Sequence, residues 1–253
     1  MKKKIIGFIP IKLNSKRLKK KPLLKLKGLP LFVHVYRRAK FSKLLDDLIV
    51  CCDNKKILFL AKKYKVKCIM TKNTHINGTE RIAEGYKKQK KKYDFIVDIQ
   101  GDEPLINPKH IDKVIKFHIK NYSSDIILPT LKIKESNNRN LIKVVKNLYG
   151  EIIYMSRLDV PYDYEKKNDN FFKHLSIISF KPKALINYSN TKRTPLEKLE
   201  NIELIRALEI GLKIKSENLT GDSFSVDVKE DYFRAKKYMN RDKLVKSYLN
   251  LWN

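Results

Sequence analysis

Short apolar runs alternate with helical patterns through the first half of this 253-residue chain. Continuous apolar runs of this length are typical of strands buried on both faces of a sheet. Their alternation with helices predicts a doubly wound, mostly parallel α/β sheet with right-handed crossovers, in which ligands bind beyond the carboxyl ends of the strands. The predicted strands cover residues 5–9, 48–52, 68–70 and 95–99, and the predicted helices begin near Pro30, Lys55, Gly78 and Asn107-Pro108.

The pattern changes after about residue 125. Strand-like segments then follow one another with little helix between them, at residues 126–128, 142–145, 152–154 and 175–180. Helix returns at residues 195–210 and again from Lys229 to the C-terminus. This order predicts a mixed-strand extension of the sheet. We therefore expect one domain over residues 1–253, with a strand-rich insertion near residues 130–190.

The chain carries 56 basic and 27 acidic residues, a formal net charge of +29 at pH 7. Such an excess favours a nucleic-acid-binding or membrane-surface protein, although 42% apolar residues exclude a disordered polycation. Forty-six of the basic residues are lysines, which usually form a solvated surface, whereas arginine is the better phosphate fork. Because the lysines spread over every predicted helix, we expect no nucleic-acid partner. A basic nucleic-acid-binding protein remains the alternative from another class.

The sequence favours a cytoplasmic location and no membrane partner. The apolar run after Met1–Lys4 is short, contains Pro10 and lacks a cleavage site, which disfavours a signal peptide. No segment approaches the roughly 20 apolar residues that span a bilayer. The three cysteines, Cys51, Cys52 and Cys68, lack metal-ligand spacing and are expected to be buried free thiols.

The loop after the first predicted strand, Pro10 to Leu23, contains six basic residues and no glycine. It is therefore neither a dinucleotide-binding GxGxxG motif nor a P-loop. Composition alone is equally compatible with a lysine-rich surface loop. Its position at the carboxyl end of a strand favours neutralisation of a triphosphate.

Acidic and small residues mark three further candidate positions. Asp102 and Glu103 follow the fourth predicted strand, and Asp227 ends a short strand predicted at residues 224–227. Carboxylates beside a phosphate site suit Mg²⁺, but an acidic turn and a helix N-cap explain these residues at least as readily. Gly78 and Thr79 offer N–H groups and a hydroxyl at a helix start, as a simple capping turn also does.

The histidines give no sign of hydrolase chemistry. No HExxH or GxSxG motif is present, which disfavours zinc-hydrolase and acyl-transfer mechanisms. His34, His110 and His118 fall on predicted helices, and we expect them at the surface or at the edge of the core.

Taken together, these segments resemble the 3-deoxy-manno-octulosonate (Kdo) cytidylyltransferase, or CMP-Kdo synthetase, family. Its motifs occur in order over residues 10–231, nearly the whole chain, so segments that are ambiguous singly become specific together. The matching residues are Ser15, Arg17, Leu18, Lys21, Pro22 and Leu23; His75, Gly78, Thr79, Glu80 and Arg81; Gln100, Gly101, Asp102, Glu103 and Pro104; Ser156, Arg157 and Pro161; His174 and Leu175; Pro195, Leu196, Glu197, Glu200, Glu203 and Arg206; and Val226, Asp227, Glu230 and Asp231.

The resemblance implies a Rossmann-like nucleotidyltransferase that uses Mg²⁺ as its cofactor. It would transfer CMP from CTP to the anomeric hydroxyl of Kdo and release pyrophosphate, giving CMP-Kdo for lipopolysaccharide or capsule synthesis. The resemblance also implies a homodimer, for which the insertion near residues 130–190 is the candidate interface.

The resemblance further implies a role for each matching site residue. Lys21, Arg17, Asp102 and Asp227 would be catalytic, and Asp102 and Asp227 would hold the metal. The CTP site would comprise Pro10, Ile11, Lys12, Arg17, Lys21, Asn77, Gly78 and Thr79. The sugar site would comprise Arg81, Gln100, Arg157, His174 and Glu203.

Four departures from the family pattern bear on the two sites. Lys12 replaces an arginine and so lacks its bidentate fork. Asn77 replaces a serine, and Ser176 replaces a glycine. Leu204 replaces a glutamine in the sugar site that the resemblance implies, so an amino-substituted Kdo or a sialic-acid-like keto acid is the alternative acceptor.

Overall fold

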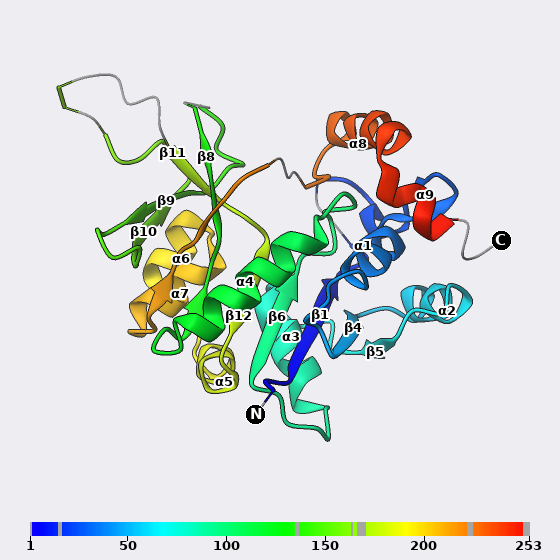
Figure 1. Cartoon of the computed structure of the whole chain (residues 1–253), viewed down its shortest axis with the longest axis horizontal. Helices are drawn as coiled ribbons and strands as arrows, with labels where there is room; N and C mark the ends of the chain where they lie inside the picture. Colours follow the sequence, from blue (N-terminus) through cyan, green and yellow to red (C-terminus); the bar gives the residue numbers. More distant parts are fainter. Residues whose placement is uncertain are drawn as a thin grey trace.

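Two fully buried strands, β1 (Ile5–Ile11) and β6 (Phe95–Ile99), lie side by side at the centre of the fold (Figure 1). They pair in parallel from Ile5 opposite Phe95 to Phe8 opposite Asp98. Complete burial is expected where helices cover both faces of a sheet. The computed structural model describes residues 2–14, 17–134, 137–162, 164–165, 171–221 and 225–249, so Ser15 and Phe224 lie outside the described residues.

A seven-stranded sheet extends to both sides of this central pair. All neighbouring strands are parallel except β12, which is antiparallel to β6 and to β7. This confirms the predicted mostly parallel α/β sheet. In order across the sheet, the strands are β13 (Ile214–Lys215), β7 (Ile126–Ile127), β12 (Ile177–Phe180), β6, β1, β4 (Asp47–Cys52) and β5 (Cys68–Met70).

Helices build a hydrophobic core on each face of this sheet. The core on one face includes residues of α1 (Leu31–Ala39), α2 (Lys55–Lys63), α4 (Pro108–Lys120), α8 (Lys229–Arg241) and α9 (Lys243–Leu249). The core on the other face includes residues of α3 (Gly78–Lys87), α5 (Pro182–Asn190) and α7 (Glu203–Glu209). The sequence pattern missed α5.

The helix starts follow their local sequence. The side chain of Asn77 accepts a hydrogen bond from the Glu80 N–H at the start of α3, and Asn107 accepts one from the Lys109 N–H at the start of α4. The single helix predicted over residues 195–210 is instead two, α6 (Pro195–Glu200) and α7, because Asn201 adopts a left-handed conformation with φ of 52°. Asparagine tolerates that conformation better than most residues, so the break changes the helix direction within one turn.

The strand-rich region forms a second sheet of five strands, at the upper left of Figure 1. No strand is found at residues 225–227, contrary to prediction. A small β2 (Lys25–Leu26)–β3 (Leu29–Pro30) ribbon and a 3₁₀ turn, η1 (Lys21–Leu23), connect β1 to α1. The five strands lie in the order β10 (Ile152–Ser156), β9 (Lys143–Lys146), β11 (Phe171–His174), β8 (Thr130–Ile133) and β14 (Asn218–Leu219).

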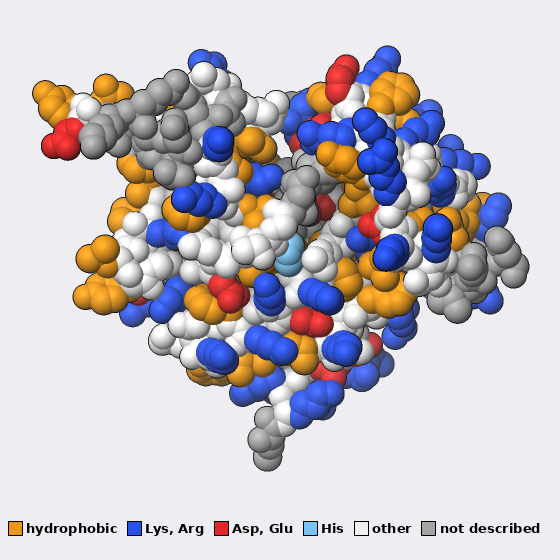
Figure 2. All heavy atoms as spheres, turned by 45° about the horizontal axis from the view of Figure 1, so that its top comes forward, with side chains coloured by type: hydrophobic (Ala, Val, Ile, Leu, Met, Phe, Trp, Pro, Cys, Tyr) orange, Lys and Arg blue, Asp and Glu red, His pale blue; other side chains and the backbone are white. Residues whose placement is uncertain are grey.

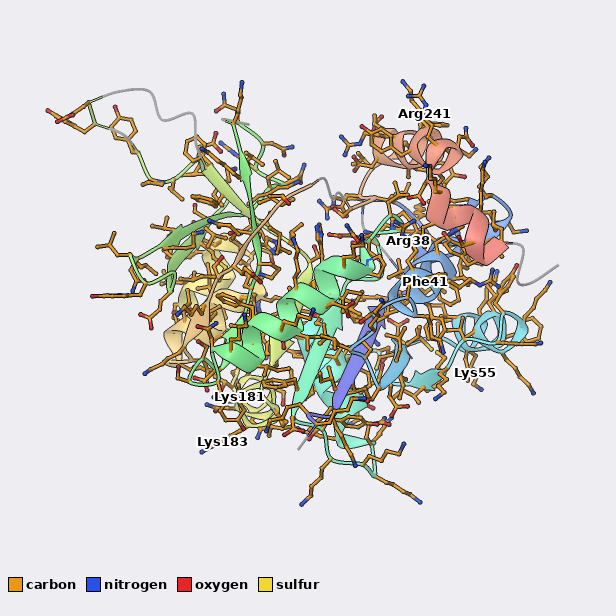
Figure 3. The ribbon with its side chains drawn as sticks, in the orientation of Figure 1. Arg38, Phe41, Lys55, Lys181, Lys183 and Arg241 are labelled. Atoms are coloured by element: carbon orange, nitrogen blue, oxygen red, sulfur yellow. The ribbon has the colours of Figure 1, made fainter. Side chains whose placement is uncertain are left out.

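Most lysines lie on the surface, whereas several arginines are buried. Figure 2 shows lysine and arginine scattered over the visible face rather than gathered in one stripe. In Figure 3, Lys181 and Lys183 lie at the start of α5 and Arg241 lies at the end of α8, far from them. Arg38, by contrast, is buried, with its Nη1 2.9 Å from Asp242 Oδ2. Arg37, Arg81 and Arg206 are buried as well, a distribution that does not favour nucleic-acid binding.

Two further features bear on the sequence predictions. Among the described helices, none is long and apolar enough to cross a membrane. All three cysteines are free; Cys51 and Cys52 are buried and Cys68 is half-buried.

The three helical histidines are buried, so the prediction of a surface or core-edge position is wrong. Polar groups from distant elements bond their rings. His34 Nδ1 lies 2.6 Å from the Tyr248 hydroxyl, and His118 Nδ1 lies 2.7 Å from Ser179 Oγ. Burial lowers the pKa of His34 and of His118 to about 4.

These histidines should make the fold acid-sensitive at mildly acidic pH. Because the unfolded chain, with a histidine pKa near 6.5, binds more protons than the folded chain between pH 6.5 and 4, the free energy of unfolding should fall as pH decreases through this window. The expected loss is about 2 kcal/mol per buried histidine between pH 7 and pH 5. Urea unfolding at the two pH values measures it. His118→Gln should reduce the difference in unfolding free energy between pH 7 and pH 5 by the contribution of one histidine. An unchanged difference would contradict the lowered pKa of His118.

Candidate active site

Three charged side chains from distant parts of the chain meet at the carboxyl edge of the large sheet. The Lys21 Nζ, in η1, lies 2.8 Å from Asp102 Oδ2 and 2.9 Å from Asp227 Oδ1. The Val226 N–H donates to the Asp102 carbonyl at 2.9 Å, which fastens the chain before α8 beside the loop after β6. The two aspartates, which the resemblance implies as metal ligands, thereby both contact one ammonium group.

Electrostatics favours the charged states of Lys21 and Asp227. Burial by itself lowers the pKa of Lys21, but the nearby carboxylates of Asp102 and Asp227 outweigh it and raise the pKa above its usual value. Burial by itself would raise the pKa of Asp227. The positive charges of Lys21 and Arg17 outweigh this effect, so the pKa of the Asp227 carboxyl lies below its usual value. Asp227 is not the N-cap of α8, because that position belongs to Val228.

Arg17 lies beside the cluster of Lys21, Asp102 and Asp227 and is more exposed than its members. Its Nη2 is 3.0 Å from Asp227 Oδ1, and its Nη1 donates to Asn140 Oδ1 at 3.1 Å. About half of its side chain is exposed, so it remains accessible to a ligand. Arg17 and Asp102 line both of the two cavities described below.

The first cavity, of about 380 Å³, lies beyond the end of β1. It contains most of the residues predicted to bind CTP. Those residues are Pro10, Ile11, Lys12, Arg17, Lys21, Asn77 and Gly78, and the cavity is also lined by Asn14, Pro22, His75, Ile76, Arg81, Gln100, Gly101 and Asp102.

Close packing explains the glycine that precedes Asp102. A Cβ on Gly101 would lie 2.1 Å from Ile11 Cδ1 and 3.0 Å from the Pro10 carbonyl oxygen. Only a glycine lets the loop after β6 pass this close to the end of β1. That approach keeps Asp102 at the edge of the first cavity.

Two predicted residues do not line the same cavity as the other members of their predicted site. Thr79 is fully buried under the start of α3 and lines neither cavity; its N–H lies 3.3 Å from Glu203 Oε2. Arg81, predicted for the sugar site, lines the first cavity instead. Its guanidinium is fixed 3.2 Å from Asp53 Oδ2 and 2.8 Å from Thr71 Oγ1, at the end of β4.

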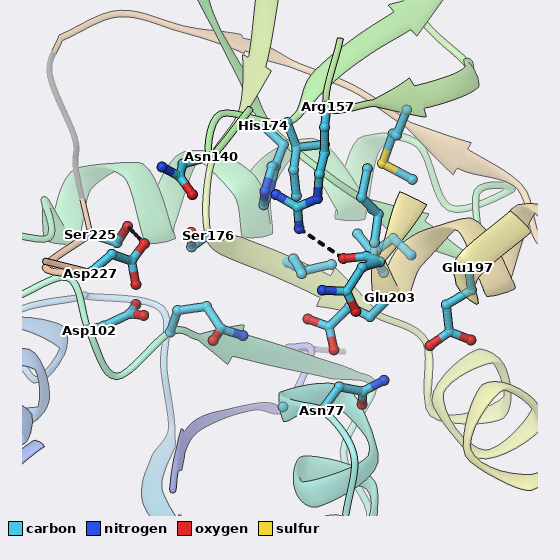
Figure 4. A pocket seen from close by; sticks show the side chains of 18 of the residues that line it. Asn77, Asp102, Asn140, Arg157, His174, Ser176, Glu197, Glu203, Ser225 and Asp227 are labelled. Carbon is cyan, nitrogen blue, oxygen red and sulfur yellow. Dashed lines mark hydrogen bonds between the residues drawn. The ribbon is translucent and has the colours of Figure 1, made fainter. Parts of the chain in front are cut away.

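The second cavity, of about 310 Å³, opens between the two sheets. In Figure 4, Asp102 and Asp227 lie on one side of it, Glu203 and Glu197 on the other, and Arg157 and His174 above. Four residues predicted for the sugar site line it: Gln100, Arg157, His174 and Glu203. Leu204 lines it too, beside the apolar residues Ile142, Met155, Ile178 and Ile202.

Burial shifts the titration of two groups in this cavity. It lowers the pKa of His174 to about 4, so the ring is neutral near pH 7. It also raises the pKa of Glu203. The cavity thus offers a neutral imidazole and a carboxyl group that takes up a proton more readily than usual, opposite the charged cluster of Lys21, Asp102 and Asp227.

The three glutamates of the motif in α6 and α7, which are Glu197, Glu200 and Glu203, make different contacts. Glu197 forms a two-point ion pair with Arg206, at 2.7 and 2.8 Å. Glu200 accepts hydrogen bonds from Ser156 Oγ at 2.9 Å and from the Arg157 N–H at 3.0 Å, which ties α6 to the end of β10. Glu197 and Glu203 both line the second cavity, whereas Glu200 does not.

Several residues at the site escaped the sequence analysis. Asp53 accepts the Leu13 N–H at 3.1 Å and so fixes the start of the basic loop. Asn140 and Arg193 also line the second cavity. Asp53 and Asn140 have no local signal, because they contact Leu13 and Arg17, which are far away in the sequence.

Sequence comparisons place this geometry in a family. The family model described as cytidylyltransferase matches residues 6–214. A 3-deoxy-manno-octulosonate cytidylyltransferase of Thermodesulfovibrio yellowstonii is 37% identical over 93% of this chain and 98% of its own length. One of Fusobacterium nucleatum is 38% identical over 95% of this chain and 99% of its own.

A solved structure agrees with these relatives. The structure of CMP:2-keto-3-deoxy-manno-octonic acid synthetase complexed with CTP matches 94% of this chain and 99% of that chain, with a TM-score of 0.87 and 27% identity. A cytidylyltransferase from Leptospira borgpetersenii, 18% identical with a TM-score of 0.65, shares the fold. The chain therefore belongs to the cytidylyltransferase family and, within it, to the 3-deoxy-manno-octulosonate cytidylyltransferases.

Proposed function

We propose that the chain transfers CMP from CTP to the anomeric hydroxyl of Kdo and releases pyrophosphate, so that CMP-Kdo becomes available for lipopolysaccharide or capsule synthesis. The observation that carries this proposal is the meeting of the two cavities at Asp102, beside Lys21 and Asp227. A transferase needs its two substrates to meet at one charged point. The relatives named above and the neighbour complexed with CTP support the choice of substrates.

CTP would occupy the cavity beyond β1. Lys21 and Arg17 would bind its phosphates, since both cations lie at the edge that this cavity shares with the aspartates. The backbone of Pro10–Lys12 and the turn at Asn77-Gly78 would contact the base. Thr79, which is buried in the first turn of α3, would not contact CTP itself but would hold the N-terminus of α3 in place beside it.

The acidic sugar would occupy the second cavity. A carboxylate favours a planar arginine fork, and Arg157 presents its guanidinium there. Gln100, neutral His174 and Glu203 would bond the sugar hydroxyls. The apolar wall that includes Leu204 is the reason to keep an amino-substituted Kdo or a sialic-acid-like keto acid as the alternative acceptor.

The residues fit a divalent cation, and we propose Mg²⁺. Asp102 and Asp227 each place a carboxylate oxygen within 2.9 Å of the same ammonium group, so two hard oxygen donors converge on one point. Such donors together with phosphate oxygens suit Mg²⁺. Bound there, the metal would neutralise charge on the phosphates. Lys21 and Arg17 add two fixed positive charges at the same place.

Pyrophosphate release is the direct test of the reaction. Purified protein with Kdo and Mg²⁺ should release pyrophosphate from CTP and far less from UTP, ATP or GTP. Running the CTP reaction with amino-substituted Kdo and a sialic acid in place of Kdo ranks the acceptors. If CTP yields no pyrophosphate with any acceptor, while the protein binds duplex DNA tightly and in a salt-sensitive manner, the nucleic-acid alternative takes its place.

Removing either carboxylate should cripple turnover. We expect Asp102→Asn and Asp227→Asn each to lower kcat by roughly 10²-fold or more, the usual scale for a lost electrostatic group aimed at the reacting phosphate. Asp94→Asn is the matched control, because Asp94 lies at the start of β6 and bonds Lys3 and the Lys4 N–H. Near-normal turnover in either site variant would remove that residue from the metal site.

We also propose a homodimer that forms through the five-stranded sheet. Strand β10 is its edge strand, and the residues around it expose apolar side chains: Leu148, Tyr149, Ile153 and Leu158 are all more than half exposed. Figure 2 shows hydrophobic side chains along this left-hand side of the molecule. An exposed apolar edge strand invites pairing with a second copy.

A charge on this edge should separate the protomers. Ile153→Asp should convert the protein from dimer to monomer, as measured by light scattering during size-exclusion chromatography. Ile119→Asp in α4, another exposed isoleucine, should leave the dimer intact. A monomeric unmutated protein, or a dimer that survives Ile153→Asp, would contradict the proposed interface.

Finally, we propose that residues 1–253 work as one cytidylyltransferase domain in the cytoplasm. The large sheet contributes Gln100 and Asp102 to the second cavity, and the small sheet contributes Met155 and His174. Neither sheet contains a complete site by itself. The three free thiols suit a reducing compartment.

A further inference from the structure

Lys143, in β9, is a lysine whose side chain has no exposed surface. Its Nζ donates to the carbonyl oxygens of Asn138 at 2.9 Å, Leu141 at 3.0 Å and Arg157 at 2.9 Å. It also lies 2.9 Å from Asp159 Oδ1. Four oxygens therefore surround an ammonium group that can donate three hydrogen bonds.

Burying the ammonium group of a lysine within a strand is unfavourable in free energy. Removing its charge from water costs several kcal/mol, which an ion pair repays only with further hydrogen bonds. An apolar side chain would fill the same space without that cost. The partners of Lys143 therefore indicate what the lysine achieves: it ties the backbone of residues 138–141 to that of residues 157–159.

Both tied segments belong to the wall of the second cavity. Asn140 lines it from one segment and Arg157 from the other. The two are also joined directly, since Arg157 Nη1 donates to the Arg139 carbonyl at 2.9 Å. Lys143 thus fixes the backbone on each side of the Arg139–Arg157 contact.

The guanidinium of Arg157 is held on its other sides by the turn between α6 and α7. Its Nε donates to the Glu200 carbonyl at 2.8 Å, and its Nη2 donates to the Asn201 carbonyl at 2.9 Å. Three carbonyl oxygens from two segments therefore set the plane of the fork. One of those segments, residues 138–141, is held in place through Lys143.

We propose that Lys143 is a positioning residue for the acidic substrate: it locks Arg157 in the orientation that receives a carboxylate before any ligand arrives. The identity of that substrate rests on the proposed function, whereas the brace itself does not. Without Lys143, the carbonyls of residues 138–141 lose their shared donor and Arg157 loses one of its three fixed acceptors. A misplacement of about 1 Å at a binding group can cost roughly 10²-fold in rate.

Steady-state kinetics separates this role from a general loss of stability. Lys143→Met should raise the KM for Kdo by roughly 10-fold or more, the scale of a misplaced binding group, and leave the KM for CTP nearly unchanged. Lys146→Met is the matched control, because Lys146 lies on the same strand and bonds Asn218 and Thr130, which line neither cavity. It should leave both values unchanged. A parallel rise in both KM values for Lys143→Met would overturn the proposal.

A double-mutant cycle tests whether Lys143 acts through Arg157. On an Arg157→Lys background, Lys143→Met should add little to the KM for Kdo, because the group that it positions is already lost. Full additivity of the two changes would show that Lys143 does not act through Arg157. If Lys143→Met fails to fold, Asp159→Ala removes the carboxylate partner of the ammonium, and a smaller rise in the same KM is expected; no rise would count against the brace.

Hydrogen exchange tests the brace without substrate. In the ligand-free protein, Lys143→Met should speed amide exchange in residues 138–141 and 157–159, whereas Lys146→Met should not. Unchanged exchange would overturn the proposal whatever the enzyme acts on. Faster exchange in a protein that releases no pyrophosphate with Kdo would instead leave the brace intact and count against the proposed acceptor.

Discussion

The parallel pairing of β1 with β6 is the constraint on which the site depends. It puts the ends of two strands at one edge of the sheet, so the loop that carries Lys21 and the loop that carries Asp102 leave the core side by side. Gly101 allows the two loops to touch. A single backbone hydrogen bond, from Val226 to Asp102, then brings in the chain that carries Asp227. The charged cluster is a consequence of this pairing, not its cause.

The sequence predicts the elements whose signals are local. The central strands β1 and β6 are continuous apolar runs, and Asn107-Pro108 is a helix start by its own chemistry, so both were predictable. The break at Asn201 and the burial of His118 were not, because a left-handed residue and a distant serine decide them. The periodicity of apolar residues does not show which distant residue a side chain will contact.

The same distinction holds at the site. Asp102 stands out because it follows a strand, whereas Asp227 is indistinguishable from a capping residue until folding brings it to Lys21. The resemblance singled out both, and it also named Arg81 for the sugar site, although Asp53 holds Arg81 at the end of β4 and it lines the first cavity. Motif matching identifies which residues belong to a family but not which cavity each of them faces.

The fold also uses buried charge to fix the geometry around both cavities. Arg81 with Asp53, Arg206 with Glu197, and Lys143 with Asp159 all lie inside the molecule. Buried ion pairs of this kind add little net stability, and their value lies in allowing one arrangement only. Arg38, Arg81 and Arg206 are the buried arginines that form such ion pairs among the described residues.

Strand β12 runs antiparallel to β6 and β7, so the residues that precede β12, rather than those that follow it, lie at the carboxyl end of β6. Ile177 lies opposite Ile99, the last residue of β6, so β12 begins where its neighbour ends. Residues that precede the strand, such as His174 and Ser176, therefore line the second cavity, and the residues that follow it, in α5, leave from the opposite end of the sheet. The two residues that link β11 to β12 therefore have almost no freedom to vary in number, because a longer link would carry His174 away from the cavity that it lines.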